Sequence, residues 1–141
     1  MPQTRKILVP VDGSASSLRA LKLAARRQLA SEDVQILVLN VQPPLPPSRY
    51  VTRSMIKDHH ERMSEAALAP ARKIIRRMKL RAECHAQVGD VASTIVAFAR
   101  KTGCEEIIMG TRGLGRISGL VLGSVAMKVV NLAQVPVTLV K

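Results

Sequence analysis

The sequence predicts one α/β domain, residues 1–141, built on a doubly wound, five-stranded parallel sheet with helices on both faces. Short apolar runs alternate with amphipathic segments along the whole chain, and most of these runs are nearly continuous, as in strands buried on both faces. With right-handed crossovers we expect the strand order 3-2-1-4-5. The first and fourth strands then flank the point where the order reverses, which is where such sheets bind ligands.

The first half of the chain supplies two predicted strands and two predicted helices. Residues 7–11 and 34–41 form the apolar runs expected as strands. Between them, one helical face is predicted from residues that recur every three or four positions, namely Leu18, Leu21, Ala25 and Leu29. Ser14 is a suitable N-cap for this helix. A second helix is expected from about residue 56 to residue 78, and Pro70 should kink or divide it.

The second half completes the alternation. Residues 82–88 alternate apolar with polar side chains, which indicates a strand at one edge of the sheet. A helix is expected at 91–101, a buried strand at 107–109, a helix at about 122–132 and a last strand at 137–140. A glycine-rich segment separates the fourth strand from the last helix.

The charge balance of the chain is strongly basic. It has 22 Lys and Arg against 10 Asp and Glu, a net charge of +12, so anionic partners must be considered. Many of these cations follow one another near the end of the second predicted helix: Arg72, Lys73, Arg76, Arg77, Lys79 and Arg81. A solvated helix face is the simplest interpretation. With one Tyr, one Phe and no Trp, the chain lacks aromatic platforms for single-stranded nucleic acids. We expect non-specific attraction to phosphate and no specific nucleic-acid partner.

Several other classes of protein are disfavoured. No apolar run approaches the roughly 18 residues of a membrane span, and the N-terminus does not resemble a signal peptide, so we expect a cytoplasmic protein without a membrane partner. Cys84 and Cys104 lack the spacing of a redox or metal motif, which favours reduced, buried thiols. His59 and His60 have no partner at ligand spacing, so we expect them to be exposed and the protein to hold no metal through its own side chains.

The glycine-rich segment after the fourth strand carries the chemistry. Five glycines in the fourteen positions 110–123 allow the backbone to approach a ligand closely, and successive N–H groups can bind an anion. The helix that begins near Gly123 adds its N-terminal N–H groups, and Ser124 adds a hydroxyl. Arg112 and Arg116 supply positive charge. These features indicate a phosphate site, although a plain flexible connector has the same composition. The spacing does not match Walker A, the dinucleotide fingerprint or a nucleophile elbow.

Asp12 follows the first strand directly and therefore lies at the same edge of the predicted sheet. Its carboxylate could contact a nucleotide or could help Ser14 to cap the first helix, and we favour the nucleotide. Ser124 is expected to serve both as a helix N-terminal residue and as a phosphate ligand.

The pattern Gly110-x2-Gly113-x9-Gly123-Ser124 resembles the ATP-binding motif of the universal stress protein family. Residues 7–14, 107–110 and 135–140 are also similar to the corresponding segments of that family, so the resemblance covers the whole chain in order. It implies a Rossmann-like, five-stranded parallel sheet, ATP at the switch point, and a homodimer paired through the last strand. An exposed last strand is itself prone to pairing.

The resemblance also implies the residues of the site. Asp12 and the backbone of Val41 would line the adenosine end, and Met109 would border the ribose or base. The ribose and phosphates would be held by Gly110, Gly113, Gly123, Ser124 and Val125. The complete expected set is Pro10, Val11, Asp12, Val41, Met109, Gly110, Arg112, Gly113, Gly115, Gly123, Ser124 and Val125. Arg116 departs from the small residue that is frequent in the family, and Glu105 replaces a frequent Asp outside the nucleotide shell.

The sequence therefore predicts an ATP-binding stress-response module that responds to nucleotide, with or without Mg²⁺. We expect no fast catalysis and assign no catalytic residue, because Asp12 is the only carboxylate that can be placed beside the loop. The alternatives are a slow ATPase or phosphotransferase, a module for AMP or cyclic AMP, and an adaptor for anionic partners without turnover.

Overall fold

Nine regular elements make up the part of the chain that the computed structural model describes, residues 4–112 and 122–141. The strands are β1 (Arg5–Pro10), β2 (Val34–Gln42), β3 (Ala82–Val88), β4 (Glu106–Gly110) and β5 (Val137–Val140). The helices are α1 (Ala15–Ala30), α2 (Arg53–Met78), α3 (Val91–Thr102) and α4 (Ser124–Leu132). Strands and helices alternate, as the sequence predicts.

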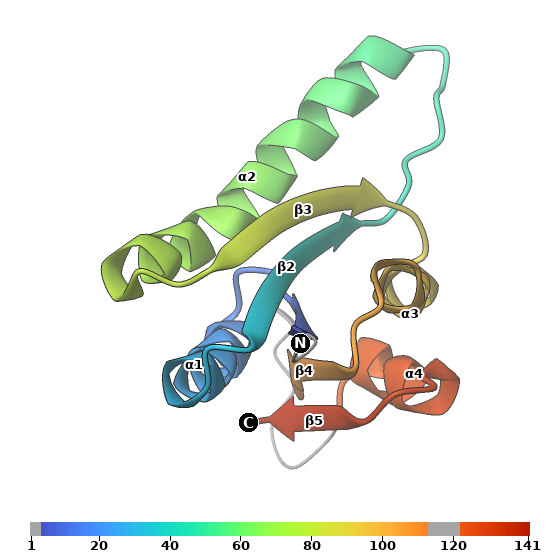
Figure 1. The fold of residues 1–141 in the computed structure, drawn as a ribbon. Coiled ribbons are helices and arrows are strands. Elements are labelled where there is room, and N and C mark those ends of the chain that lie inside the picture. The colour runs from blue at the N-terminus through green and yellow to red at the C-terminus, as the bar shows by residue number, and fades with distance from the viewer. Residues whose placement is uncertain (1–3, 113–121) are drawn as a thin grey trace.

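All five strands are parallel and lie in the order β3-β2-β1-β4-β5 (Figure 1). This order confirms the predicted doubly wound sheet. β1 lies at the centre, where Ile7 pairs with Ile36 of β2 and Leu8 pairs with Ile107 of β4. β3 and β5 form the two edges, so the predicted edge position of residues 82–88 is also confirmed.

The core is divided by the sheet into two layers. Alternate side chains of one strand point to opposite faces, so Ile7 and Val9 pack with α1 and α2, whereas Leu8 packs with α3 and α4. Figure 1 shows the two pairs of helices on opposite sides of the sheet. Because both faces are covered, the central strands require the nearly continuous apolar runs seen in the sequence.

Helix α1 begins where the sequence predicts, but its buried face differs at the C-terminal end. The Ser14 hydroxyl accepts a hydrogen bond from the Ser17 N–H at 3.3 Å and caps the helix. Leu29, predicted on the buried face, is 67% exposed. Gln28 is buried in its place, because its side-chain amide satisfies backbone groups in the turns after α1 and α2. The prediction for Leu29 was therefore wrong.

Helix α2 is longer and more continuous than predicted. It begins at Arg53, because the Thr52 hydroxyl accepts from the Met55 N–H at 3.2 Å and caps the helix earlier. Pro70 lies inside one uninterrupted helix, so of the two expected effects the division of the helix is wrong, and a kink stays a prediction. The helix ends at Lys79, whose left-handed backbone (φ 52°) lets its N–H bond back to the Arg76 carbonyl.

The predictions for histidines and cysteines had mixed outcomes. His60 is buried, with Nε2 3.0 Å from the Pro43 carbonyl oxygen, so its predicted exposure was wrong. Cys84 and Cys104 are both free thiols; Cys104 is buried as predicted, whereas Cys84 is only partly buried, so the predicted burial of Cys84 was wrong. Burial raises the pKa of each thiol above its ordinary value, which keeps both in the neutral form at physiological pH. Among the described residues, no helix is both long and apolar enough to cross a membrane.

Candidate functional site

A cavity of about 250 Å³ opens at the carboxyl ends of the central strands. Its walls come from the ends of β1, β2 and β4, the first turn of α4, and the inner face of α3. The lining residues are Pro10, Val11, Asp12, Ser17, Leu39, Asn40, Val41, Val91, Ile95, Met109, Gly110, Thr111, Arg112, Gly123, Ser124, Val125 and Ala126. The cavity therefore lies between β1 and β4, where the strand order reverses, at the place expected for a ligand in this sheet.

Every predicted site residue that the structure describes lines this cavity. These residues are Pro10, Val11, Asp12, Val41, Met109, Gly110, Arg112, Gly123, Ser124 and Val125. Gly113, Gly115 and Arg116 lie outside the described residues. Residues that are up to 115 positions apart in the sequence thus meet around one volume, because parallel strands bring their carboxyl ends to the same edge.

Asp12 supports the start of α1 and also lies at the cavity, while its contact with a nucleotide stays a prediction. Its Oδ1 accepts a hydrogen bond from the Ser14 N–H at 2.9 Å, which shapes the turn between β1 and α1. The Ser14 hydroxyl then performs the N-cap itself. Asp12 also lines the cavity, so its carboxylate is fixed at the rim of the site by the same turn that starts α1.

Gly110 has a packing role in addition to its place in the cavity wall. A Cβ at this position would overlap the Ser16 Oγ and would lie only 2.9 Å from the Ser16 backbone carbonyl carbon. Only glycine therefore lets β4 pass so close to the first turn of α1. The Ser16 hydroxyl also donates to the Arg112 carbonyl at 2.6 Å, which anchors the chain as it leaves β4.

The N-terminus of α4 faces the cavity through Gly123 and Ser124. The Gly123 N–H donates to the Thr111 carbonyl at 2.7 Å, so the start of α4 is tied to the end of β4. Among the described residues, no side chain caps this helix. The N–H groups of its first turn and the positive end of its dipole are suited to bind an anion at this wall.

Asn40 is the most important lining residue that the sequence analysis missed. It is buried in β2, donates from Nδ2 to the Val11 carbonyl at 2.7 Å, and accepts from Gln42 Nε2 at 2.9 Å. The amide of Asn40 within the apolar stretch of residues 36–41 was the available signal, because a buried polar side chain needs partners. The apolar wall formed by Val91, Ile95 and Ala126 was also missed, because in the sequence such residues cannot be distinguished from ordinary core residues of a helix.

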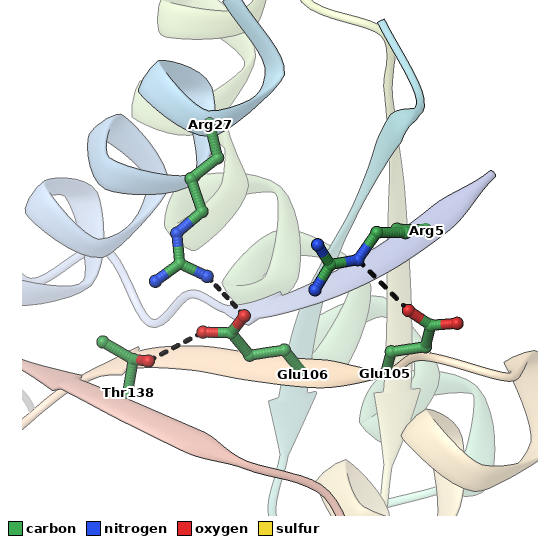
Figure 2. Close-up of polar contacts among 5 residues, drawn as sticks. All are labelled: Arg5, Arg27, Glu105, Glu106 and Thr138. Atoms are coloured by element: carbon green, nitrogen blue, oxygen red, sulfur yellow. Dashed lines mark hydrogen bonds and ion pairs between the residues drawn. The ribbon is translucent and has the colours of Figure 1, made fainter. Parts of the chain in front are cut away.

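The opposite end of the sheet holds charged groups that are paired within the protein (Figure 2). Glu106, at the start of β4, is ion-paired with Arg27 of α1 and accepts from the Thr138 hydroxyl of β5 at 2.7 Å. Its neighbour Glu105 forms an exposed ion pair with Arg5 at 3.3 Å and does not line the cavity. No group of three or more His, Cys, Asp or Glu side chains suited to a metal occurs among residues 4–112 and 122–141.

A family model for the universal stress protein family matches residues 3–141 of this chain. The chain belongs to the universal stress protein family. Universal stress protein MJ0531 of Methanocaldococcus jannaschii is 31% identical over 139 residues, which cover 97% of this chain and 82% of the relative. The resemblance found in the glycine-rich segment is therefore confirmed at the level of the family.

Solved structures of universal stress proteins share the fold. The protein from Archaeoglobus fulgidus in complex with dAMP is 26% identical, with a TM-score of 0.69 and complete coverage of both chains. A universal stress protein in complex with cAMP is also 26% identical, with a TM-score of 0.72 over 97% of each chain. Both of these structures are complexes with an adenine nucleotide.

Proposed function

We propose that this protein is a cytoplasmic ATP-binding module that changes its interactions when nucleotide binds. The observation that carries the proposal is the convergence of Asp12, Gly110 and the N-terminus of α4 on one cavity at the switch point of the sheet. The complexes of related proteins with dAMP and cAMP support an adenine nucleotide as the ligand. ATP is the preferred member of this class because Gly110, Gly123 and Ser124 fit the family's ATP-binding pattern.

Different parts of the cavity wall are suited to different parts of the nucleotide. Val41, Val91 and Ile95 provide apolar surface suited to adenine, while Asp12 can accept a hydrogen bond from a ribose hydroxyl. The first turn of α4, with the Ser124 hydroxyl, is suited to the phosphates. Mg²⁺ would be held largely by the phosphates themselves, which agrees with the absence of a metal-binding cluster among the described side chains.

We expect turnover of ATP to be slow or absent. Asp12 is the only carboxylate among the described residues that line the cavity, and one of its oxygens already accepts from the Ser14 N–H. Fast hydrolysis needs a group that positions the attacking water as well as groups that neutralise the phosphates. A slow ATPase or phosphotransferase is the alternative, with Asp12 as its water-positioning residue.

The first experiment is to denature freshly purified protein and to identify any released nucleotide by mass spectrometry. The emptied protein is then titrated with ATP, AMP and cyclic AMP by calorimetry, with and without Mg²⁺. We expect ATP to bind most tightly, and Asp12→Ala to weaken it by about tenfold, the effect of one hydrogen bond to a charged group. Asp58→Ala removes an exposed carboxylate of α2 as the matched control and should leave the affinity unchanged.

Each outcome of the titration has a definite meaning. Preference for AMP or cyclic AMP would replace ATP with another adenine nucleotide in the same cavity. Steady release of phosphate that disappears in Asp12→Ala would favour the slow ATPase. If no adenine nucleotide is released or bound, the proposed function is wrong.

We also propose that two copies pair through the free edge of β5. Within the described chain, β5 pairs only with β4, and the neighbouring helix α4 exposes Met127, Val130 and Leu132. Pairing would satisfy the outer backbone groups of β5 and cover apolar surface. Sedimentation equilibrium should give a dimer, and Val130→Lys should weaken it more than Met55→Lys on α2. A monomer at all concentrations would reject this assembly.

A further inference from the structure

Exposed cations are frequent on α1 and from the C-terminal half of α2 to its C-cap. Six of them form what we call the basic helix surface: Lys22, Arg26, Lys73, Arg76, Arg77 and Lys79. No acidic side chain of the described chain forms an ion pair with any of the six. The sequence also contains no Asp or Glu at positions 13–31 or 66–82, so acidic neighbours along these two segments are absent.

The fold holds these two segments side by side. α1 and α2 cover the same face of the sheet (Figure 1) and share one apolar cluster. Their C-terminal ends are joined through Gln28, whose Nε2 donates to the Arg81 carbonyl and whose Oε1 accepts from the Arg81 N–H, both at 2.8 Å. Arg81 also donates to the Glu32 carbonyl at 2.6 Å, which ties the turn after α2 to the turn after α1. The two helices that carry these exposed cations therefore lie on the same side of the sheet, although they come from distant parts of the sequence.

The helix dipole does not account for all of this charge. Arg76 and Arg77 lie in the last turn of α2, where a cation stabilises the helix. Lys22, Arg26 and Lys73 lie before the last turns of their helices, where the dipole is weak. The N-terminal half of α2 differs, because its cations Arg53, Lys57 and Arg62 are matched in number by the acidic residues Asp58, Glu61 and Glu65.

We infer that the basic helix surface binds the phosphate backbone of a nucleic-acid duplex without reading its sequence. Exposed Arg and Lys side chains replace the counterions of phosphates, and this exchange supplies the affinity of sequence-independent binding. Two neighbouring helices with cations along their exposed faces offer several such contacts to a regular array of phosphates.

The surroundings favour a duplex over other anionic partners. Single strands bind by stacking on aromatic rings, but Tyr50 precedes α2 and Phe98 is buried on the opposite face of the sheet. A membrane surface requires apolar side chains that insert beside the cations. Among the exposed large hydrophobic residues of the described chain, Leu29 alone lies within positions 13–31 or 66–82.

The test uses the full-length protein and a fluorescein-labelled DNA duplex, followed by anisotropy over a range of salt concentrations. About six phosphate contacts predict a slope of about −5 for log K against log[salt], and about a 10³-fold loss of affinity between 50 and 200 mM salt. The triple variant Lys73→Gln/Arg76→Gln/Arg77→Gln should bind about 10²-fold more weakly at 100 mM salt and reduce the slope to about −3. Gln preserves helix propensity at these exposed positions.

The matched control is Arg53→Gln/Lys57→Gln/Arg62→Gln, which removes the same charge from the other half of the same helix. It should retain the slope of the parent protein, and circular dichroism should show that both variants are folded. Equal losses in the two variants would show that net charge alone drives binding and would overturn the inference. Stronger retention of the parent on phosphatidylserine vesicles or polyglutamate, at a salt concentration where the duplex is released, would also overturn it.

Discussion

Polar groups at the two ends of the sheet differ in whether the protein itself supplies their partners. At the amino end, Glu106 is largely buried and receives both Arg27 and Thr138, so its charge is compensated within the protein (Figure 2). At the carboxyl end, Asp12 and the start of α4 border a cavity, and no described side chain caps that helix. The first arrangement stabilises the sheet, whereas the second leaves hydrogen-bonding groups available to a ligand.

This difference indicates that a binding site on such a sheet belongs at the end where polar groups border a cavity. A buried carboxylate without a partner is strongly destabilising, so groups inside the scaffold must be paired by the protein. Groups at a cavity can be solvated until a ligand arrives. The sequence contains Glu105 and Glu106 side by side, yet only Glu106 joins three elements of the scaffold.

The largest loss of stability is expected when the ion pair between Arg27 and Glu106 at the amino end of the sheet is removed. Arg27→Ala leaves the Glu106 carboxylate buried with Thr138 as its remaining partner and should lower the free energy of unfolding by about 3 kcal/mol. Arg5→Ala removes the exposed partner of Glu105 and should cost less than about 1 kcal/mol. Urea denaturation measures both.

A double variant sharpens this prediction. Arg27→Ala/Glu106→Gln should recover part of the lost stability, because the uncompensated charge is removed while Thr138 can still donate to the amide oxygen. Equal costs for Arg27→Ala and Arg5→Ala would contradict the difference in burial on which the comparison rests.

A smaller loss is expected at the carboxyl end, where Asn40 is the internal support of the cavity. Asn40→Leu leaves the Val11 carbonyl and the Gln42 amide without their partner and should cost about 2 kcal/mol, the penalty for an unsatisfied buried group. Asn131→Leu, at an exposed position of α4, is the control and should change stability by less than about 0.5 kcal/mol. Similar denaturation midpoints for the two variants would show that Asn40 has no supporting role.

The smallest effect concerns the N-cap of α3 and depends on pH. Hydrogen bonds from the Ser93 hydroxyl and N–H lower the pKa of Asp90. The folded protein therefore binds this proton less readily than the unfolded chain, so the stabilisation is present above the ordinary Asp pKa of about 4 and is lost as pH falls through the lowered folded value. Asp90→Ala should lower the melting temperature at neutral pH, and the difference in melting temperature between the two proteins should shrink as the pH falls below the ordinary Asp pKa. A gap that persists unchanged in acid would disprove the charged cap.

Much of the fold was predictable because local patterns and topology agree. The continuous apolar run of β2 and the alternation of β3 predicted a central and an edge strand, and both predictions are confirmed. Asp12, Gly110 and Ser124 could be assigned to one edge of the sheet because parallel strands end together. Leu29 and His60 were misjudged, since each depends on contacts with segments distant in sequence. For Pro70 only the expected division of the helix was wrong, because a long helix can continue through a proline.

By itself, the sequence indicated the doubly wound parallel sheet through its alternating apolar and amphipathic segments, and it indicated the family through the resemblance of its glycine-rich motif. Only the tertiary structure decided that Gln28 rather than Leu29 is buried, that Asn40 supports the cavity, and that Glu106 joins β4 to α1 and β5. It also decided that α1 and α2, which carry many of the exposed cations, cover the same face of the sheet. The physical reason is the same in each case: buried polar groups and surface charge act through neighbours in space, and the chain order does not specify those neighbours.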